Sequence, residues 1–242
     1  GFIAPLKDGP VMKEDGDWVF DPHRLDFIGE DVESPDTVNP SLWRQGQLCA
    51  SGGLFQVTDR LYQVRNLDVS NLTIIEGDTG LIVVDPLISA ETAKAAMELY
   101  FEHRPEKPVI AVIHSHSHVD HYGGVKGVVD EADVEAGKVR IIAPEGFLEA
   151  AAAENVLVGN AMTRRAMFQF GGLLAPDEKG TVGVGLGIGV SLGTVTLIPP
   201  TDTITETGQK MVIDGLTFEF MLTPDTEAPA EMHWYIEELK AV

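Results

Sequence analysis

Short apolar runs separated by turn-forming residues follow one another along most of the chain, and this pattern is typical of a sheet-rich domain. From Leu54 onward, residues 61–64, 72–75 and 81–84 predict three strands. Asp78-Thr79-Gly80 lies between the last two runs and is a tight-turn signal, so these two strands are predicted to form a hairpin.

A helical pattern follows the third of these strands. Ser89 is a typical N-cap, and the helix that it begins is predicted to run to about His103, where Pro105 and Pro108 end it. The apolar residues 109–113 then predict a buried strand. A strand, a helix and a strand in this order favour parallel pairing of the strands, with the helix on the outer face of the sheet.

The second half of the chain continues this mixture of helices and strands, which indicates an α/β fold. Gly123-Gly124 is interpreted as the start of a helix through Val129, with the positive end of its dipole near the preceding loop. Further strands are predicted at residues 139–143, 194–198 and 216–222, the last two in a second sheet, and further helices at residues 147–154 and 160–170.

The first 53 residues differ from the rest because they are rich in Pro, Gly and Asp and hold only short apolar pieces, such as residues 18–20. This composition predicts an extended N-terminal arm that lies on other surfaces of the protein instead of forming its own core. Residues 54–242 are then predicted to form the main folded domain.

Four histidines and an aspartate are concentrated in the eight residues after the strand at 109–113. His116, His118, Asp120 and His121 form the pattern H-x-H-x-D-H, and imidazole and carboxylate groups are preferred zinc ligands. Two histidines two positions apart lie on the same side of an extended segment, and the Asp-His pair follows where the chain turns. One loop is therefore predicted to offer one pair of ligands to one metal and a second pair to a neighbouring metal.

The strand, the H-x-H-x-D-H motif and the following Gly-Gly resemble the metallo-β-lactamase superfamily. Four further segments are similar to one family within it, the alkylsulfatases that hydrolyse sodium dodecyl sulfate and related sulfate esters: residues 37–45 (TVNPSLWRQ), 61–77, 160–165 (NAMTRR) and 226–232 (TEAPAEM). The resemblance covers nearly the whole chain. It implies an αββα sandwich, incomplete here on its C-terminal side, with metals held at its edge.

The resemblance also implies a ligand set for two zinc ions, with Asp120 and Glu227 taking part in catalysis. Glu227 occupies the place where a typical member of the superfamily has a histidine, and Asp225 replaces the glycine that is usual in this turn. Glu231, four residues later, is the competing candidate for the same role. The implied metal ligands are His116, His118, Asp120, His121 and Glu227. Five ligands leave each of two zinc ions short of the roughly four that zinc usually binds.

For the intact enzyme, the resemblance implies hydrolysis of alkyl sulfate esters to alcohol and sulfate by a metal-activated hydroxide. One alternative is a hydrolase of the same fold that acts on thioesters or lactones, and Glu227 in place of histidine argues against it. Another is an inactive fragment that holds metal only for stability. In the family, further metal ligands, sulfate-binding residues and a dimerisation region follow later in the sequence. None of these occurs in the 242 residues. The chain is therefore expected to be a truncated piece, inactive alone, from an enzyme that dimerises through absent regions.

The formal net charge of −21 argues against nucleic acid as a partner, because phosphate binding needs clustered Lys and Arg. No apolar run approaches the roughly 18 residues that suggest a membrane span. Cys49 is the single cysteine, so an intrachain disulfide is excluded. A periplasmic or secreted location is expected from the family resemblance alone.

Several residues near the motif have two possible interpretations. Asp85 either supports the metal-binding loop from beneath or only ends its strand, and His114 is expected to have a buried, supporting role. Arg164 and Arg165 either form salt bridges that hold their helix on the sandwich or contact the sulfate group. The glycine-rich residues 183–193 do not fit a nucleotide-binding loop, which leaves a mobile loop or a plain linker.

Overall fold

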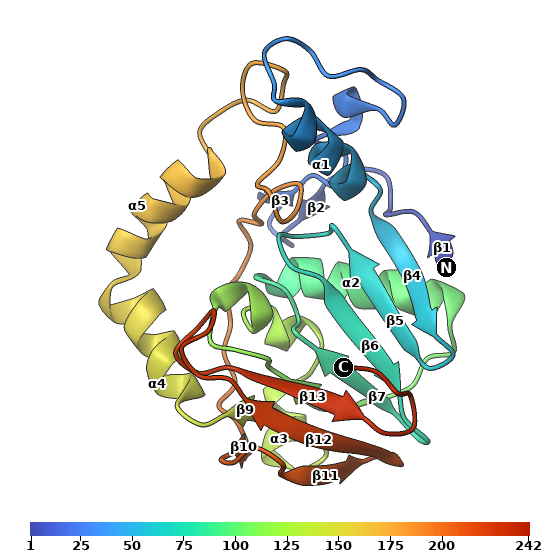
Figure 1. Ribbon diagram of the computed structural model, residues 1–242. Helices are drawn as coiled ribbons and strands as arrows, with labels where there is room; N and C mark the ends of the chain where they lie inside the picture. The colour runs from blue at the N-terminus through green and yellow to red at the C-terminus, as the bar shows by residue number, and fades with distance from the viewer.

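The computed structural model describes residues 1–242, and two stacked β-sheets form its centre (Figure 1). The larger sheet has eight strands in the order β1-β4-β5-β6-β7-β8-β9-β10, and the smaller has three in the order β11-β12-β13. The strands of the larger sheet are β1 (Phe2–Ala4), β4 (Gly53–Thr58), β5 (Leu61–Arg65), β6 (Leu72–Glu76), β7 (Leu81–Val84), β8 (Val109–Ile113), β9 (Arg140–Pro144) and β10 (Asp202–Ile204). Those of the smaller are β11 (Lys210–Ile213), β12 (Leu216–Leu222) and β13 (Met232–Ile236), and β2 (Val11–Met12) pairs with β3 (Trp18–Phe20).

The longest helix, α2 (Ala90–His103), covers one face of the larger sheet (Figure 1). The other α-helices are α1 (Pro40–Ala50), α3 (Glu131–Glu135), α4 (Phe147–Ala152) and α5 (Gly159–Phe170), and the π-helix η4 (Ala153–Leu157) joins α4 to α5. Short 3-10 turns occur at η1 (Asp26–Ile28), η2 (Val119–His121) and η3 (Val125–Gly127). None of these helices has both the length and the apolar character needed to cross a membrane.

Alternating side chains of the central strands supply two separate hydrophobic cores. Leu81 and Val83 of β7 face α2 and belong to the larger cluster, whereas Ile82 and Val84 face the smaller sheet. This arrangement follows from the two-residue period of a strand, and it explains why a strand buried on both faces is apolar throughout. The layers are therefore helix, sheet and sheet, which confirms the predicted α/β sandwich.

The hairpin and the crossover predicted from the sequence are both present. Strands β6 and β7 pair antiparallel on either side of residues 77–80. Strands β7 and β8 pair parallel, and helix α2 forms the crossover between them. The side chain of Ser89 accepts a hydrogen bond from the backbone N–H of Thr92, so Ser89 is the N-cap of α2 as predicted.

The first 53 residues contain helix α1 and three short strands, β1 to β3, and several of their apolar side chains are buried in the larger core. Strand β1 pairs antiparallel with β4 at the edge of the sheet. Val19, Phe20 and Trp43 are almost completely buried among residues of the main domain. The indole N–H of Trp43 donates to the carbonyl of Val32, which folds this part of the chain back on helix α1.

The helix predicted from Gly123-Gly124 onward is wrong, because only the short turn η3 forms there. Both glycines are packed directly against backbone atoms of the segment before α2. A Cβ atom at Gly124 would lie 2.0 Å from the carbonyl oxygen of Pro86, and one at Gly123 would lie 2.1 Å from that of Ile88. The glycines therefore allow a close approach of two chain segments, and no long helix directs its dipole at the loop before them.

The strand predicted at residues 194–198 is also wrong, since this segment is extended but pairs with no strand. Thr196 instead binds the carbonyl of Gly123 through its backbone N–H and its hydroxyl. The next strand along the chain is β10, which pairs parallel with β9 in the larger sheet; of the two strands predicted in a second sheet, only the one at 216–222 forms there, as β12. The glycine-rich segment before it is packed on the main core: Ser191 donates its N–H and hydroxyl to the buried carboxylate of Asp68.

Candidate metal centre

The histidine-rich loop begins where β8 leaves the middle of the larger sheet. His114 is still part of the sheet, because its N–H donates to the carbonyl of Ile142. Its ring is fully buried, stacks on Phe147 at 5.2 Å and has Nδ1 3.0 Å from the carbonyl oxygen of His121. Burial lowers the pKa of His114 to about 4, so the ring is neutral and donates from Nδ1. The predicted supporting role of His114 is confirmed.

His116, His118 and Glu227 converge on one point and form the first ligand group. His116 Nε2 lies 3.2 Å from His118 Nδ1, and Glu227 Oε1 lies 3.9 Å from the former and 3.8 Å from the latter. All three atoms lie within 4.8 Å of one another, a spacing that suits a single metal ion. The loop between β12 and β13 brings Glu227 to this point, where it meets the segment that follows β8 (Figure 1).

Asp120 and His121 form a second group beside the first. His121 Nε2 lies 3.1 Å from Asp120 Oδ2, and the rings of His116 and His121 are 4.0 Å apart. Burial disfavours a charge on His121, but the carboxylates of Asp85 and Asp120 outweigh this effect and raise its pKa to about 11. Burial would raise the pKa of Asp120, yet the hydrogen bond from His121 lowers it. The structure thus brings all five predicted ligand residues together.

Asp85 supports the loop from beneath, as one of the two sequence interpretations proposed. Its carboxylate accepts hydrogen bonds from the backbone N–H of Ser115 at 2.8 Å, from the Ser115 hydroxyl at 2.6 Å and from His121 Nδ1 at 2.9 Å. Ser115 Oγ in turn lies 2.9 Å from His116 Nδ1. These contacts hold one nitrogen of each ring and leave Nε2 of His116 and of His121 facing the two ligand groups. Metal-binding histidines are commonly oriented in this way.

Glu231, the competing candidate, has a different place. Its buried carboxylate accepts hydrogen bonds from Thr226 Oγ1 at 2.7 Å, from the Glu227 N–H at 2.8 Å and from the Ala228 N–H at 3.0 Å. Its backbone also forms an isolated β-bridge with His116. Glu231 therefore shapes the loop that presents Glu227 and joins it to the histidine loop. A carboxylate four residues after Glu227, within a run of turn residues, was the only sequence signal for this role.

Two more residues near the ligands were not identified from the sequence. Glu154 Oε1, from the π-helix, lies 3.8 Å from His118 Nε2, whereas Glu227 lies near Nδ1 of the same ring. The hydroxyl of Ser70 donates to the backbone carbonyl of Asp120 at 2.5 Å.

Arg164 and Arg165 are exposed and take part in no salt bridge within the described chain, so the salt bridges considered for them are absent.

The donor set fits zinc on chemical grounds. Imidazole nitrogens and carboxylate oxygens are its usual ligands in proteins, and no cysteine lies among them. The other nitrogen is within hydrogen-bond distance of Ser115 in His116 and of Asp85 in His121, and Glu154 lies 3.8 Å from that of His118. The arrangement therefore has the oriented ligands that a metal site requires.

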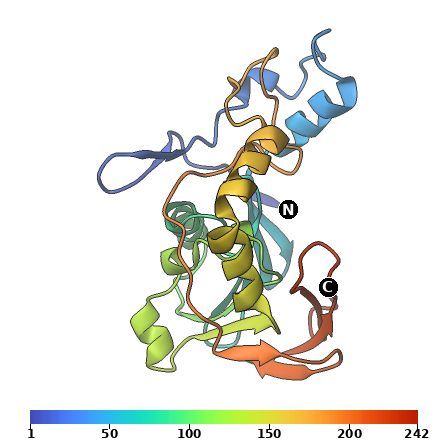
Figure 2. The ribbon, with the colours of Figure 1, turned by 90° about the vertical axis from the view of Figure 1, so that its left-hand side faces the viewer.

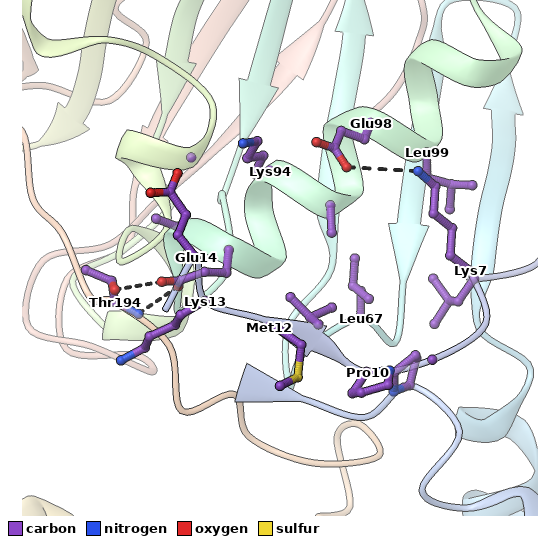
Figure 3. A pocket seen from close by; sticks show the side chains of 18 of the residues that line it. Lys7, Pro10, Met12, Lys13, Glu14, Leu67, Lys94, Glu98, Leu99 and Thr194 are labelled. Atoms are coloured by element: carbon purple, nitrogen blue, oxygen red, sulfur yellow. Dashed lines mark hydrogen bonds and ion pairs between the residues drawn. The ribbon is translucent and has the colours of Figure 1, made fainter. Parts of the chain in front are cut away.

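A cavity of about 920 Å³ lies elsewhere (Figure 3). Met12 and Leu67 contribute to its apolar wall, and Lys94 and Glu98 project from helix α2. No residue of either ligand group lines it, and lysines and acidic residues both occur around it. This cavity has neither the ligands for a metal nor a single sign of charge that would favour an anion.

Comparison with known proteins gives the site its context. The family model of the metallo-β-lactamase superfamily matches residues 65–231. A linear primary-alkylsulfatase from Pseudomonas sp is 64% identical over the whole chain, and an alkyl/aryl-sulfatase from Saccharomyces cerevisiae is 53% identical. The chain spans 36% and 37%, respectively, of the length of these relatives.

A solved structure has nearly the same fold. The stereoselective inverting sec-alkylsulfatase from Pseudomonas sp. superposes with a TM-score of 0.94 at 47% identity, over 98% of this chain and 37% of that one. The matched superfamily region begins at the end of β5 and ends at Glu231, so it includes both ligand groups. The sandwich, the H-x-H-x-D-H loop and this match agree: the chain belongs to the metallo-β-lactamase superfamily.

Proposed function

We propose that the protein hydrolyses alkyl sulfate esters to an alcohol and sulfate, with two zinc ions held beside the end of β8. The observation that carries this proposal is the convergence of His116, His118 and Glu227 next to the Asp120–His121 pair. The similarity to alkylsulfatases along the whole chain supports the choice of substrate. Glu227 in place of the histidine usual in the superfamily separates this chain from its thioester- and lactone-cleaving members.

The two ligand groups would hold one zinc ion each. His116, His118 and Glu227 would hold the first, and Asp120 and His121 would contribute to the second, with further ligands from solvent or from other parts of the protein. Zinc supplies Lewis acidity toward the sulfate oxygens and lowers the pKa of water at the site.

The residues of the chain have separate tasks in this proposal. Asp85 and Ser115 fix the imidazole rings of His116 and His121, so the ligand atoms need no rearrangement before the substrate binds. The carboxylate of Glu154, 3.8 Å from Nε2 of His118, places a negative charge beside that ring. The Ser115 hydroxyl contacts Asp85 and Nδ1 of His116, which is not the ring nitrogen that faces the ligand group, so it orients the ring instead of serving as a nucleophile. Cys49 is not near the ligand groups in sequence or among their contacts, and direct attack by water is therefore favoured.

The test is sulfate release from dodecyl sulfate by the complete protein and by residues 1–242, each before and after removal of metal by a chelator. We expect activity of the complete protein to be lost on chelation and recovered with zinc. A lactone, a thioester and a β-lactam serve as competing substrates. Turnover of a lactone or thioester with no detectable sulfate release from any alkyl sulfate would contradict the proposal.

A further inference from the structure

We infer that Asp68 is a positioning residue for the Asp120–His121 pair, an inference that rests on the two zinc ions of the proposed function. Asp68 lies in the loop between β5 and β6 and is fully buried. No hydrogen bond joins its carboxylate to a ligand residue. It acts instead through two chain segments that hold the pair from its two ends.

Five donors converge on the two carboxylate oxygens of Asp68. Oδ1 accepts from the backbone N–H of Val69 at 2.8 Å and from that of Ser191 at 3.0 Å. Oδ2 accepts from the Ser191 hydroxyl at 2.6 Å, the Thr92 hydroxyl at 3.1 Å and the Ile88 N–H at 3.3 Å. Burial raises the pKa of Asp68, and the hydrogen bonds from Ser191, Val69 and Thr92 oppose this effect. The carboxylate therefore fastens three segments to one another: the loop before β6, the start of α2 and the glycine-rich residues 183–193.

The loop before β6 leads directly to the pair. Ser70, two residues after Asp68, donates its hydroxyl to the backbone carbonyl of Asp120 at 2.5 Å and is itself buried. The hydrogen bond from the Val69 N–H to Asp68 fixes the conformation of the chain between them. A change at Asp68 therefore reaches Asp120 through a few covalently linked residues.

The glycine-rich segment leads to the other end of the pair. It belongs to the stretch that joins α5 to β10 along one side of the molecule (Figure 2). Ser191 attaches this stretch to Asp68. Five residues later, Thr196 donates its backbone N–H and its hydroxyl to the carbonyl of Gly123, both at 2.7 Å. Because Gly123 follows His121 by two residues, this segment carries the constraint from Asp68 to the chain just after the pair.

The glycines of this segment allow its contact with the loop of Asp68. A Cβ atom at Gly187 would lie 2.9 Å from the carbonyl oxygen of Asp68, and one at Gly193 would lie 2.6 Å from Oγ of Ser89. Side chains at these positions would push the segment away from Asp68 and from the start of α2. The alternating glycines thus have a packing role that their sequence pattern alone did not show.

The first ligand group has supports of its own, namely Ser115 beside His116 and Glu231 behind Glu227. Asp68 takes part in neither contact. Its loss should therefore weaken zinc binding chiefly at the second group.

Asp68→Asn in the complete protein tests the inference. The amide group of asparagine cannot accept hydrogen bonds on both of its heavy atoms, so at least one donor loses its partner. We expect zinc binding at the pair to weaken about tenfold and zinc binding at the first group to weaken less than about threefold. The effect is limited because bonds from Thr194 to Glu91 also hold the glycine-rich segment. Competition with a chromogenic chelator gives the two affinities, and Asp120→Ala identifies which of them belongs to the pair.

Glu76→Gln is the matched control. The Glu76 carboxylate is also largely buried and accepts hydrogen bonds from the Tyr100 hydroxyl and from Arg104. It lies at the end of β6 that pairs with the start of β7, away from the ligand groups. The substitution should lower the midpoint of urea denaturation, as Asp68→Asn does, but leave both zinc affinities unchanged.

A double-mutant cycle separates positioning from a loss of stability. Ser70→Ala and Thr196→Val together weaken both connections between Asp68 and the pair. In this background, Asp68→Asn should lower zinc affinity at the pair less than about threefold instead of about tenfold, because changes along one path are not additive. A role in stability alone would not make the effect on zinc depend on Ser70 and Thr196.

Three results would overturn the inference: unchanged zinc affinity at the pair in Asp68→Asn, equal weakening at both ligand groups, or an undiminished effect in the Ser70→Ala/Thr196→Val background. If Asp68→Asn does not fold, Ser191→Ala takes its place under the same three criteria. It removes one donor to Asp68 and should weaken zinc binding at the pair about threefold. Absence of sulfate release by the unaltered complete protein would contradict the proposed function alone, because these comparisons measure zinc binding and not turnover.

Discussion

The two ligand groups differ in how they are held. The Glu227 side chain is 62% exposed and comes from a loop far along the chain, so the first group is open and is assembled from two segments. The side chains of Asp120 and His121 are only 22% and 20% exposed, adjacent in sequence, and held by Asp85 and Ser70. The second group, Asp120 and His121, is therefore oriented by local contacts and is called the tethered pair below. The first group, His116, His118 and Glu227, depends on the tertiary position of one loop and is called the open group.

This difference predicts which changes affect which metal. The open group should be sensitive to anything that moves the β12–β13 loop, which is held near the histidines by Glu231, by the β-bridge at His116 and by the packing of Ala230. The tethered pair should be sensitive to the residues beneath it. Four tests, taken from the largest expected effect to the smallest, examine this distinction.

Removal of a ligand should have the largest effect. His116→Ala should abolish tight binding at the open group, and Asp120→Ala should do so at the tethered pair, so each variant should lose about one equivalent of zinc. Elemental analysis after zinc loading and gel filtration measures the content. His103→Ala, at the exposed end of α2, is the matched control and should keep full metal content. Unchanged metal content in both ligand variants would contradict the assignment.

Asp85→Asn should weaken zinc binding at the tethered pair by roughly 10–100-fold and at the open group by less, because Asp85 contacts His121 directly but reaches His116 only through Ser115. The reason is that an amide cannot accept the three hydrogen bonds that orient Ser115 and His121. Competition with a chromogenic chelator resolves the two affinities. Asp214→Asn is the control, because its carboxylate also accepts backbone and hydroxyl donors, but at the opposite end of β7. Equal weakening of both sites would show that the groups are not held separately.

Glu231→Gln should act on the open group instead. The substitution disturbs the bonds from Thr226, Glu227 and Ala228, so we expect about tenfold weaker zinc binding there and a loss of about 1–3 kcal/mol in the free energy of unfolding. Chelator competition and urea denaturation give the two quantities. Glu237→Gln, on the exposed end of the same hairpin, is the control. Loss of an entire zinc equivalent would instead indicate that Glu231 is itself a ligand.

Ser70→Ala should have the smallest effect. Loss of its hydrogen bond to the Asp120 carbonyl should cost about 1 kcal/mol of stability and weaken the tethered pair only a few-fold. Thermal unfolding of the metal-free and zinc-bound chains measures both. Ser51→Ala is the control: it removes an exposed hydroxyl that donates to the carbonyl of Gln47 at 3.4 Å and should leave zinc affinity unchanged. A larger effect on the open group than on the pair would reverse the distinction drawn here.

The sequence by itself determined the features that depend on neighbouring residues. The apolar run before His114, the cap at Ser89 and the turn at 78–80 specify a strand, a helix and a hairpin through local geometry. The spacing of His116, His118, Asp120 and His121 indicated a metal-binding loop for the same reason. These features were predictable because hydrogen bonding and side-chain direction within a few residues decide them.

The tertiary structure alone decided the features that depend on segments far apart in the chain. It brings Glu227 to the histidines, gives Glu231 its role within the loop and sets Asp85 beneath Ser115 and His121. It also overrides the helix signal at Gly123-Gly124, because these glycines permit close contact with the segment before α2. Contacts of this kind follow from how layers pack, and no local pattern encodes which distant backbone a given residue will meet.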